Sequence, residues 1–290
     1  MVVSAATILM MAISAVISIG LPVALLIIWH KKTGAKWTAA IVGAILFVLF
    51  VFGLENGLHQ IMIFNDTGAS RFLKTNLWAY ILYAGLAAGV FEETARLIAF
   101  KWLLKKQTDR STGVMYGIGH GGIEAILIAG VSMISSISFA LTLNALGESA
   151  VLAKYVGQET AIAATIAALK QQSAGLYLVT GIERAIAIVL HISLSVMVFF
   201  AARRSGKMWL YPAAIGVHAA VDCFAVLYQV GILTNIVLIE AGVLVMTLAT
   251  AYWAYRIYRE DCAEGDAATV SQTPAAEPAP AQEAAPEKAE

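Results

Sequence analysis

The chain has 290 residues, of which 60% are hydrophobic and 13% are charged, and its formal net charge is zero. Soluble domains carry about 25% charged residues, so this composition excludes an ordinary soluble domain and predicts a membrane protein. A neutral charge balance offers no basic field for nucleic acid, and the distant cysteines Cys223 and Cys262 predict neither a disulfide framework nor a cysteine zinc site.

Long apolar runs predict the fold class. A run of about 20 apolar residues is long enough to cross the hydrocarbon core as a helix. In chain order, such runs cover residues 4–29, 38–63, 77–103, 112–142, 174–201, 209–229 and 232–256. The first run is too long for the apolar core of a cleaved signal peptide. We therefore expect an all-α fold, a polytopic transmembrane helical bundle of about seven or eight spans within residues 1–258.

The connections between these runs predict the topology. Residues 64–76 are expected to form a loop, and residues 144–172 an amphipathic helix at the membrane interface. Residues 259–290 are rich in Ala, Pro and Glu, which predicts a disordered tail. Most Lys and Arg residues of the connections fall on one side of the predicted bundle, and that side is expected to be cytoplasmic. The expected location is the cell membrane, with the N-terminus outside and the tail in the cytoplasm.

The predicted spans contain many ionisable residues. A charge at mid-bilayer costs at least about 2.5–3.5 kcal/mol, so such residues must pair or line a cavity, and they suggest function. Three pairs with i, i+4 spacing each share one helix face: Glu92 with Arg96, His120 with Glu124, and His218 with Asp222. Glu93 lies about 100° around the helix from Glu92.

The depth of these residues is also informative. Counted from the cytoplasmic ends of four helices, Glu92, His120, His191 and His218 all lie roughly 12–15 Å deep. Four helices therefore place polar groups in one layer. A second layer lies nearer the outside and is predicted to be structural, with Glu55 or Glu240 neutralising Arg184. The members of this outer layer are Glu55, His59, Glu183, Arg184 and Glu240.

The inner layer is suited to water activation, and two mechanisms remain open. In the metal-free one, Glu92 activates water together with His120, and His218 stabilises an oxyanion. In the other, zinc is the cofactor, with Glu92 as the base. The candidate zinc ligands are His120, Glu124, His218 and Asp222. Glycines at 117, 119, 121 and 122 beside His120 indicate either close helix packing or room for a substrate.

The motifs FEETAR, HGGIE and HAAVD, in this order on successive spans, resemble the YhfC family of intramembrane proteases. That family lies in the clan of the CAAX prenyl proteases (CPBP) and PrsW. The resemblance covers about residues 1–258. It implies an all-helical membrane protease in which a glutamate activates the water that hydrolyses a peptide bond. The predicted catalytic set is Glu92, Glu93, Arg96, His120, Glu124, His218 and Asp222.

Two departures from the CAAX prenyl proteases affect the predicted roles. Their motif spaces the basic residue as EExxxR, whereas Arg96 follows at EExxR, and their final motif is HxxxN, whereas Asp222 replaces the amide. A carboxylate repels an oxyanion unless it is protonated or bound to a metal. Asp222 is therefore expected either to orient water or to bind a metal.

The expected partner is a membrane-embedded or lipid-anchored protein substrate within the lipid bilayer, and no nucleic acid. Rival interpretations are a proton-coupled transporter, in which acid and His chains relay protons, haem ligation by paired histidines, and a non-catalytic scaffold. The sequence carries no inverted-repeat signal of the kind that many transporters have. Haem ligation by paired histidines does not explain why Glu92 and Arg96 lie in a membrane span.

Overall fold

The computed structural model describes residues 2–271, and within that range the side chains of residues 2–260. Every regular element in the described range is a helix. The α-helices are α1 (Ala5–Thr33), α2 (Trp37–Phe47), α3 (Asn56–His59), α4 (Gly68–Thr75), α5 (Leu77–Ile98), α6 (Ser111–Ala125), α7 (Val131–Leu146), α8 (Glu148–Leu152), α9 (Glu159–Gln171), α10 (Ala174–Arg203), α11 (Leu210–Gln229) and α12 (Ile236–Ser271). The π-helical segments are η1 (Val48–Glu55), η2 (Gln60–Phe64), η3 (Ala99–Leu103) and η4 (Ile126–Gly130).

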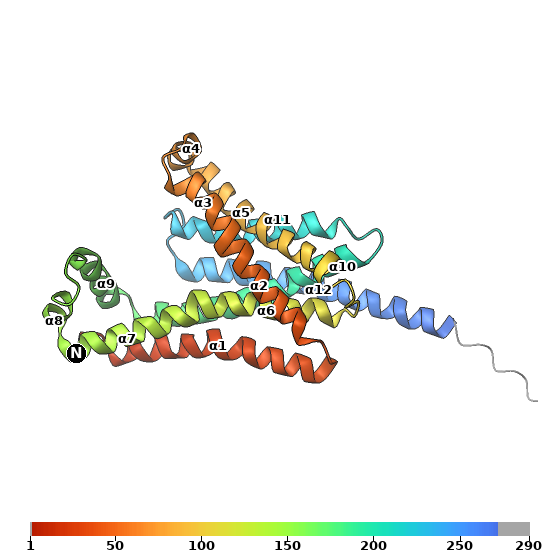
Figure 1. Cartoon of the computed structure of the whole chain (residues 1–290), viewed down its shortest axis with the longest axis horizontal. Helices are drawn as coiled ribbons and strands as arrows, with labels where there is room; N and C mark the ends of the chain where they lie inside the picture. Colours follow the sequence, from red (N-terminus) through yellow and green to blue (C-terminus); the bar gives the residue numbers. More distant parts are fainter. Residues whose placement is uncertain (1, 272–290) are drawn as a thin grey trace, which may run out of the picture.

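Six helical segments of the described chain are long and apolar enough to cross a membrane. They are Ala5–Thr33, Trp37–Phe64, Ser111–Leu146, Ala174–Arg203, Leu210–Gln229 and Ile236–Glu260. The remaining predicted span corresponds to α5 with η3, whose residues Glu92, Glu93 and Arg96 make it less apolar. This helix packs along α11 within the same bundle (Figure 1). The prediction of an all-α, polytopic bundle is confirmed.

Residues 64–76, predicted to be a loop, contain the helix α4. The hydroxyl of Thr67 accepts a hydrogen bond from the backbone N–H of Ser70 at 3.0 Å and so caps the helix at its start. Two turns are too short to produce the extended apolar periodicity from which a helix is predicted. The loop prediction was therefore wrong.

Residues 144–172 also differ from the prediction of one amphipathic helix. Helix α7 continues to Leu146, and the short helices α8 and α9 follow it. Gly147 and Gly157 have φ angles of +81° and +83°, a conformation that is strained for other residues and that separates these helices. Two glycines therefore divide the predicted helix into two.

Helix α12 continues to Ser271, beyond residue 259, where the predicted tail begins. Residues 272–290 hold the rest of that predicted tail and lie outside the described residues. The predicted disorder therefore stays a prediction.

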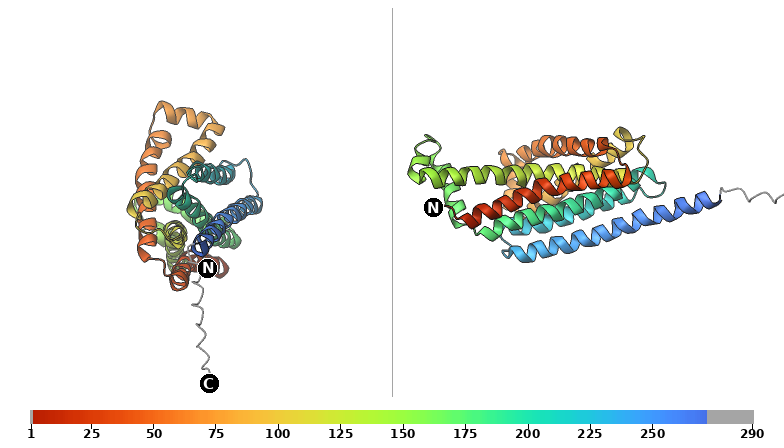
Figure 2. Two further views of the ribbon diagram at one scale, coloured as in Figure 1. Left: turned by 90° about the vertical axis from the view of Figure 1, so that its right-hand side faces the viewer. Right: turned by 90° about the horizontal axis from the view of Figure 1, so that it is seen from below.

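Helix α10 is the central helix of the bundle. In its most apolar stretch 72% of the residues are buried, against 17% for α12. It packs against α6, α1, α12, α11 and α5, and Figure 2 shows α1, α10 and α12 running side by side. Side chains that α10 directs into the bundle are therefore surrounded by other helices.

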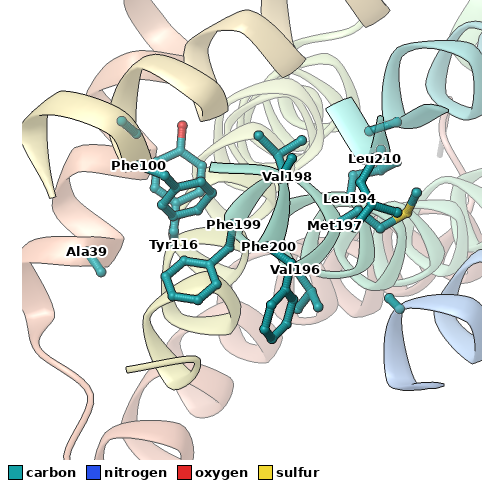
Figure 3. Close-up of a cluster of buried hydrophobic side chains, with 14 of the residues drawn as sticks. Ala39, Phe100, Tyr116, Leu194, Val196, Met197, Val198, Phe199, Phe200 and Leu210 are labelled. Carbon is teal, nitrogen blue, oxygen red and sulfur yellow. The ribbon is translucent and has the colours of Figure 1, made fainter. Parts of the chain in front are cut away.

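Figure 3 shows part of a cluster of large apolar side chains that fills the bundle. The cluster includes Leu104, which precedes Lys105 and whose backbone carbonyl accepts a hydrogen bond from Arg203 Nη2 at 2.6 Å, so it lies toward the end that carries these two residues. Its centre is three fully buried rings, Phe100, Tyr116 and Phe199, which we call the aromatic seal. The ring centroid of Phe100 lies 4.8 Å from that of Tyr116 and 5.3 Å from that of Phe199. The three rings are therefore packed tightly against one another inside the bundle.

Glycines on α6 allow neighbouring helices to approach closely. A Cβ added at Gly119 would lie 2.2 Å from the carbonyl oxygen of Ala40, and one added at Gly117 would lie 2.6 Å from Cα of Ile192. Both neighbours are backbone atoms of other helices, which cannot move aside locally. Helix packing is thus what these two glycines provide, as small residues do at helix interfaces in membranes.

Substituting Gly119→Ala is expected to lower the free energy of unfolding by about 1–3 kcal/mol, because the added methyl group overpacks the contact with Ala40. Gly57→Ala is the matched control, since no atom lies within 4 Å of a Cβ at that helical position. Unfolding of both purified variants in detergent, followed by circular dichroism, measures the difference. Equal stability of the two variants would contradict the close approach of α2 and α6.

Candidate active site

Glu92 of α5 lies at the centre of the buried polar layer. Its Oε2 atom accepts a hydrogen bond from His120 Nε2 at 2.8 Å and a longer one from Arg96 Nη2 at 3.4 Å. His120 comes from α6 and is fully buried. Two of the motifs that were predicted to share a layer are therefore in direct contact.

His218 of α11 is oriented by the second carboxylate of the pair. Its Nδ1 atom lies 2.7 Å from Glu93 Oε1, and because a carboxylate only accepts, Nδ1 carries the proton. In the neutral ring Nε2 is then an acceptor. It lies 3.9 Å from Glu92 Oε1 and 3.5 Å from Asp222 Oδ2.

Arg96 is fully buried and connects two helices, its own α5 and the central helix α10. Its Nη1 donates to Glu93 Oε1 at 2.6 Å, its Nε donates to Ser195 Oγ at 3.1 Å, and its Nη2 donates to His191 Nδ1 at 2.6 Å. One guanidinium therefore faces the carboxylates of both Glu92 and Glu93. A buried cation with this many partners fixes the positions of all of them.

His191 of α10 lies between the other two imidazoles, although the catalytic set predicted from the sequence does not include it. Its ring centroid is 5.3 Å from that of His120 and 5.6 Å from that of His218. Because an arginine only donates, Nδ1 of His191 accepts, and its Nε2 then carries the proton toward the carboxylate of Glu124. The signal available in the sequence was its depth, which matches that of the other members of the inner layer.

Glu124 links the inner layer to the outer one. Besides contacting His191, it accepts a hydrogen bond from Arg184 Nη1 at 2.6 Å, and Arg184 also pairs with the adjacent Glu183. The prediction that Glu55 or Glu240 would neutralise Arg184 is therefore wrong. Helix α10 turns the guanidinium toward α6, and spacing along single helices could not predict this.

Glu55 has a different partner. Its Oε1 lies 3.4 Å from His59 Nε2, and His59 Nδ1 lies 2.7 Å from the hydroxyl of Tyr83. The outer layer therefore consists of two separate groups, one around Arg184 and one around His59.

Buried polar atoms in and beside the inner layer lack a hydrogen-bond partner among the described residues, among them His120 Nδ1 and Glu93 Oε2. Most buried polar groups in proteins are paired with protein or with water. The unpaired atoms indicate that this layer can accept water.

Glu92, His191 and His218 could hold a metal ion. One ligand atom of each lies within 4.8 Å of the others, and all three residues are buried. Two imidazoles and a carboxylate match a known donor set of catalytic zinc, and Glu93 orients His218 as carboxylates orient metal-binding histidines. The donor set fits a metal. To bind it, one ring nitrogen of His191 would have to give up its contact with Arg96 or with Glu124.

The zinc ligands predicted from spacing form a different set, and only His218 belongs to both. His120 Nε2 is occupied by Glu92, and Glu124 is occupied by Arg184. Haem ligation is also disfavoured, because the three imidazole rings pack against one another.

A cavity of about 330 Å³ borders this layer between α10, α11 and α12. Glu92, His191, His218 and Asp222 contribute to its wall at one end. The cavity places open space directly beside the imidazoles of His191 and His218 and the carboxylate of Glu92.

Sequence comparisons relate the chain to known proteins. A sequence model described as YhfC intramembrane metalloprotease matches residues 17–243. The chain is 31% identical over 257 residues to the "Uncharacterized membrane protein YhfC" of Bacillus subtilis (strain 168), an alignment that covers 89% of this chain and 98% of the relative. No solved structure matches the chain significantly. The chain therefore belongs to the YhfC intramembrane metalloprotease family.

Proposed function

We propose that this protein is an intramembrane endopeptidase that hydrolyses a peptide bond in a membrane-embedded or lipid-anchored protein. One observation carries the proposal. Glu92 Oε1 and His218 Nε2 face each other at 3.9 Å beside the cavity, and in the neutral imidazole both atoms are acceptors. Two acceptors at this separation need a donor or a cation between them, which a water molecule or a metal ion supplies.

The chain's own residues are suited to activating such a water. His120 and Arg96 hold Oε2 of Glu92, so its Oε1 remains directed toward the water. Glu92 takes a proton from the water while the water oxygen attacks the peptide carbonyl carbon. The proton then passes to the amide nitrogen, which leaves as an amine when the C–N bond breaks. Asp222, beside His218 Nε2, orients the water, since a carboxylate would not stabilise an oxyanion.

The family description implies a metal, and Glu92, His191 and His218 are the residues that would hold it. In that case Glu92 acts as a ligand, as an alternative to the role of free base described above. When bound, the ion supplies Lewis-acid activation of water. Glu93 then keeps His218 in the required tautomer through Nδ1, and Arg96 compensates the charge of the two adjacent carboxylates. Zinc is the metal that best suits this mixed imidazole and carboxylate set.

The test uses purified protein in detergent with a fluorogenic membrane-spanning peptide as the substrate. Removing divalent metal with a chelator is expected to abolish hydrolysis, and added zinc is expected to restore it. His191→Ala is expected to weaken metal binding by at least about 10-fold, and metal content by mass spectrometry measures this. His59→Ala is the matched control, because His59 contacts Glu55 and Tyr83 and is not part of the metal-binding group.

The outcomes separate the mechanisms. Full hydrolysis by protein that contains no metal would exclude the metal-dependent mechanism and would leave Glu92 as the group that activates water. An absence of hydrolysis by zinc-loaded protein, together with proton-coupled solute uptake in vesicles, would favour the transporter. The orientation that we propose, with the N-terminus outside the cell membrane, follows from the Lys and Arg residues of the connections.

A further inference from the structure

A second cavity lies between α11, α5 and the segment that holds His59 and Ile63. Its volume is about 320 Å³, and His59 and Tyr80 contribute to its wall. Asp222, Ala225 and Gln229 border both this cavity and the one beside the inner layer. These three residues are spaced i, i+3 and i+7, which places them on one face of α11. The two cavities thus share this face of α11 as a common wall, and we call them together the α11 groove.

The α11 groove runs in one direction from the candidate active site. It begins at His218 and reaches Gln229, eleven residues further along α11, a distance of roughly 16 Å. Toward the opposite end of α11, Leu210 and Ala214 are fully buried in the apolar cluster that also holds the aromatic seal. The groove therefore opens toward the end where α11 connects to α12, away from Lys105 and Arg203.

The lining of the groove indicates what it binds. One wall carries Glu183, Arg184 and Glu240, and the other carries His59 and Tyr80. By contrast, two other cavities of the described bundle have almost entirely apolar linings, one beside Trp29 and one beside Pro22. An acyl chain needs only an apolar wall. An extended peptide in a membrane needs partners for its backbone N–H and C=O groups, and a polar groove supplies them.

We infer that the α11 groove binds the substrate as an extended polypeptide strand, which enters from the end of the bundle opposite the Lys- and Arg-rich connections. A length of roughly 16 Å accommodates about five residues at about 3.3 Å each. The scissile bond then lies at the His218 end of the groove. This inference rests on the proposed peptidase function and adds the conformation and the direction of the bound substrate.

The first test measures access of water to the groove and is independent of catalysis. Ala225→Cys and Ala220→Cys are placed in a Cys223→Ser, Cys262→Ser background. Ala220 is exposed on the face of α11 opposite the groove. A membrane-impermeant thiosulfonate is expected to modify position 225 at least about tenfold faster than position 220, since lipid excludes the charged reagent. Modification is expected from the side on which a Lys154→Cys variant reacts.

Occupancy is tested with the same variants. A Leu-rich membrane-spanning peptide with a central Gly-Pro-Gly break, which favours an extended segment, is expected to protect the Ala225→Cys variant from modification, whereas oleate is not. Equal reaction at positions 225 and 220, reaction from the side of a Lys106→Cys variant, or protection by oleate alone would each overturn the inference.

The second test fills the groove. Ala225→Phe is expected to lower kcat/KM for the fluorogenic peptide by about tenfold or more without changing metal content, because the ring occupies the path of the substrate. Ala220→Phe is expected to cleave like the wild type. Wild-type cleavage by Ala225→Phe would contradict the inference. If the wild type itself does not cleave, the proposed function fails, and the modification experiment still decides whether the groove admits water and peptide.

Discussion

Glu92→Gln is expected to lower kcat/KM for peptide hydrolysis by about 10²–10⁴-fold, the contribution usual for a general base. The amide has the same shape as the carboxylate, but its oxygen and NH₂ group can neither take up the proton of the attacking water nor supply an anionic metal ligand. Steady-state hydrolysis of the fluorogenic membrane-spanning peptide measures the loss. The amount of folded protein after purification is expected to be unchanged.

Glu148→Gln is the matched control for this substitution. Glu148 forms an exposed ion pair with Lys170 at 2.9 Å, far along the chain from the inner layer. Its loss is expected to leave hydrolysis unchanged, because exposed ion pairs contribute only about 0–1 kcal/mol. If the Glu92→Gln variant retained the activity of the Glu148→Gln variant, Glu92 could not be the activating group.

Arg96→Met is expected to destabilise the protein by about 3–5 kcal/mol, the cost of removing one partner from a buried ion pair. The guanidinium is fully buried against Glu93, Glu92 and His191. Methionine keeps much of the side-chain volume but leaves two adjacent buried carboxylates without a cation. Thermal unfolding in detergent is expected to show a large decrease in Tm.

Arg71→Met is the control for Arg96→Met. Arg71 pairs with Asp66 at 2.7 Å, but both side chains are exposed, so the expected change is within about 0–1 kcal/mol. Similar Tm values for the two variants would show that the charge of Arg96 is not needed to stabilise the inner layer.

Hydropathy and depth counting predicted much of this fold and part of the site. Spans follow from apolar runs because the bilayer fixes their length. Depth follows from residue counts because the rise per residue of a helix is constant. For these reasons Glu92, His120 and His218, which lie on different helices, could be assigned to one layer before any contact between them was known.

The rotation of each helix about its axis could not be predicted in the same way. Spacing at i, i+4 puts His120 and Glu124 on one face of α6, but it does not show which neighbours that face meets. In the structure, His120 contacts Glu92 while Glu124 contacts Arg184 and His191. The partners come from helices far apart in the sequence, so only packing determines them. The sequence does not reveal these partners, so it could not show whether His191 belongs to the site or only forms a hydrogen bond with a neighbouring helix.

The aromatic seal has a consequence for the membrane itself. The α11 groove, if it holds water as its inferred role requires, would shorten the insulating path that separates the two aqueous phases. The packed rings of Phe100, Tyr116 and Phe199 make up part of the remaining insulator. With the groove hydrated, a transmembrane voltage, worth about 2.3 kcal/mol per elementary charge per 100 mV, would fall mainly across the apolar layer that holds these rings. The aromatic seal would then be the part of the bundle that keeps protons from crossing through the hydrated interior.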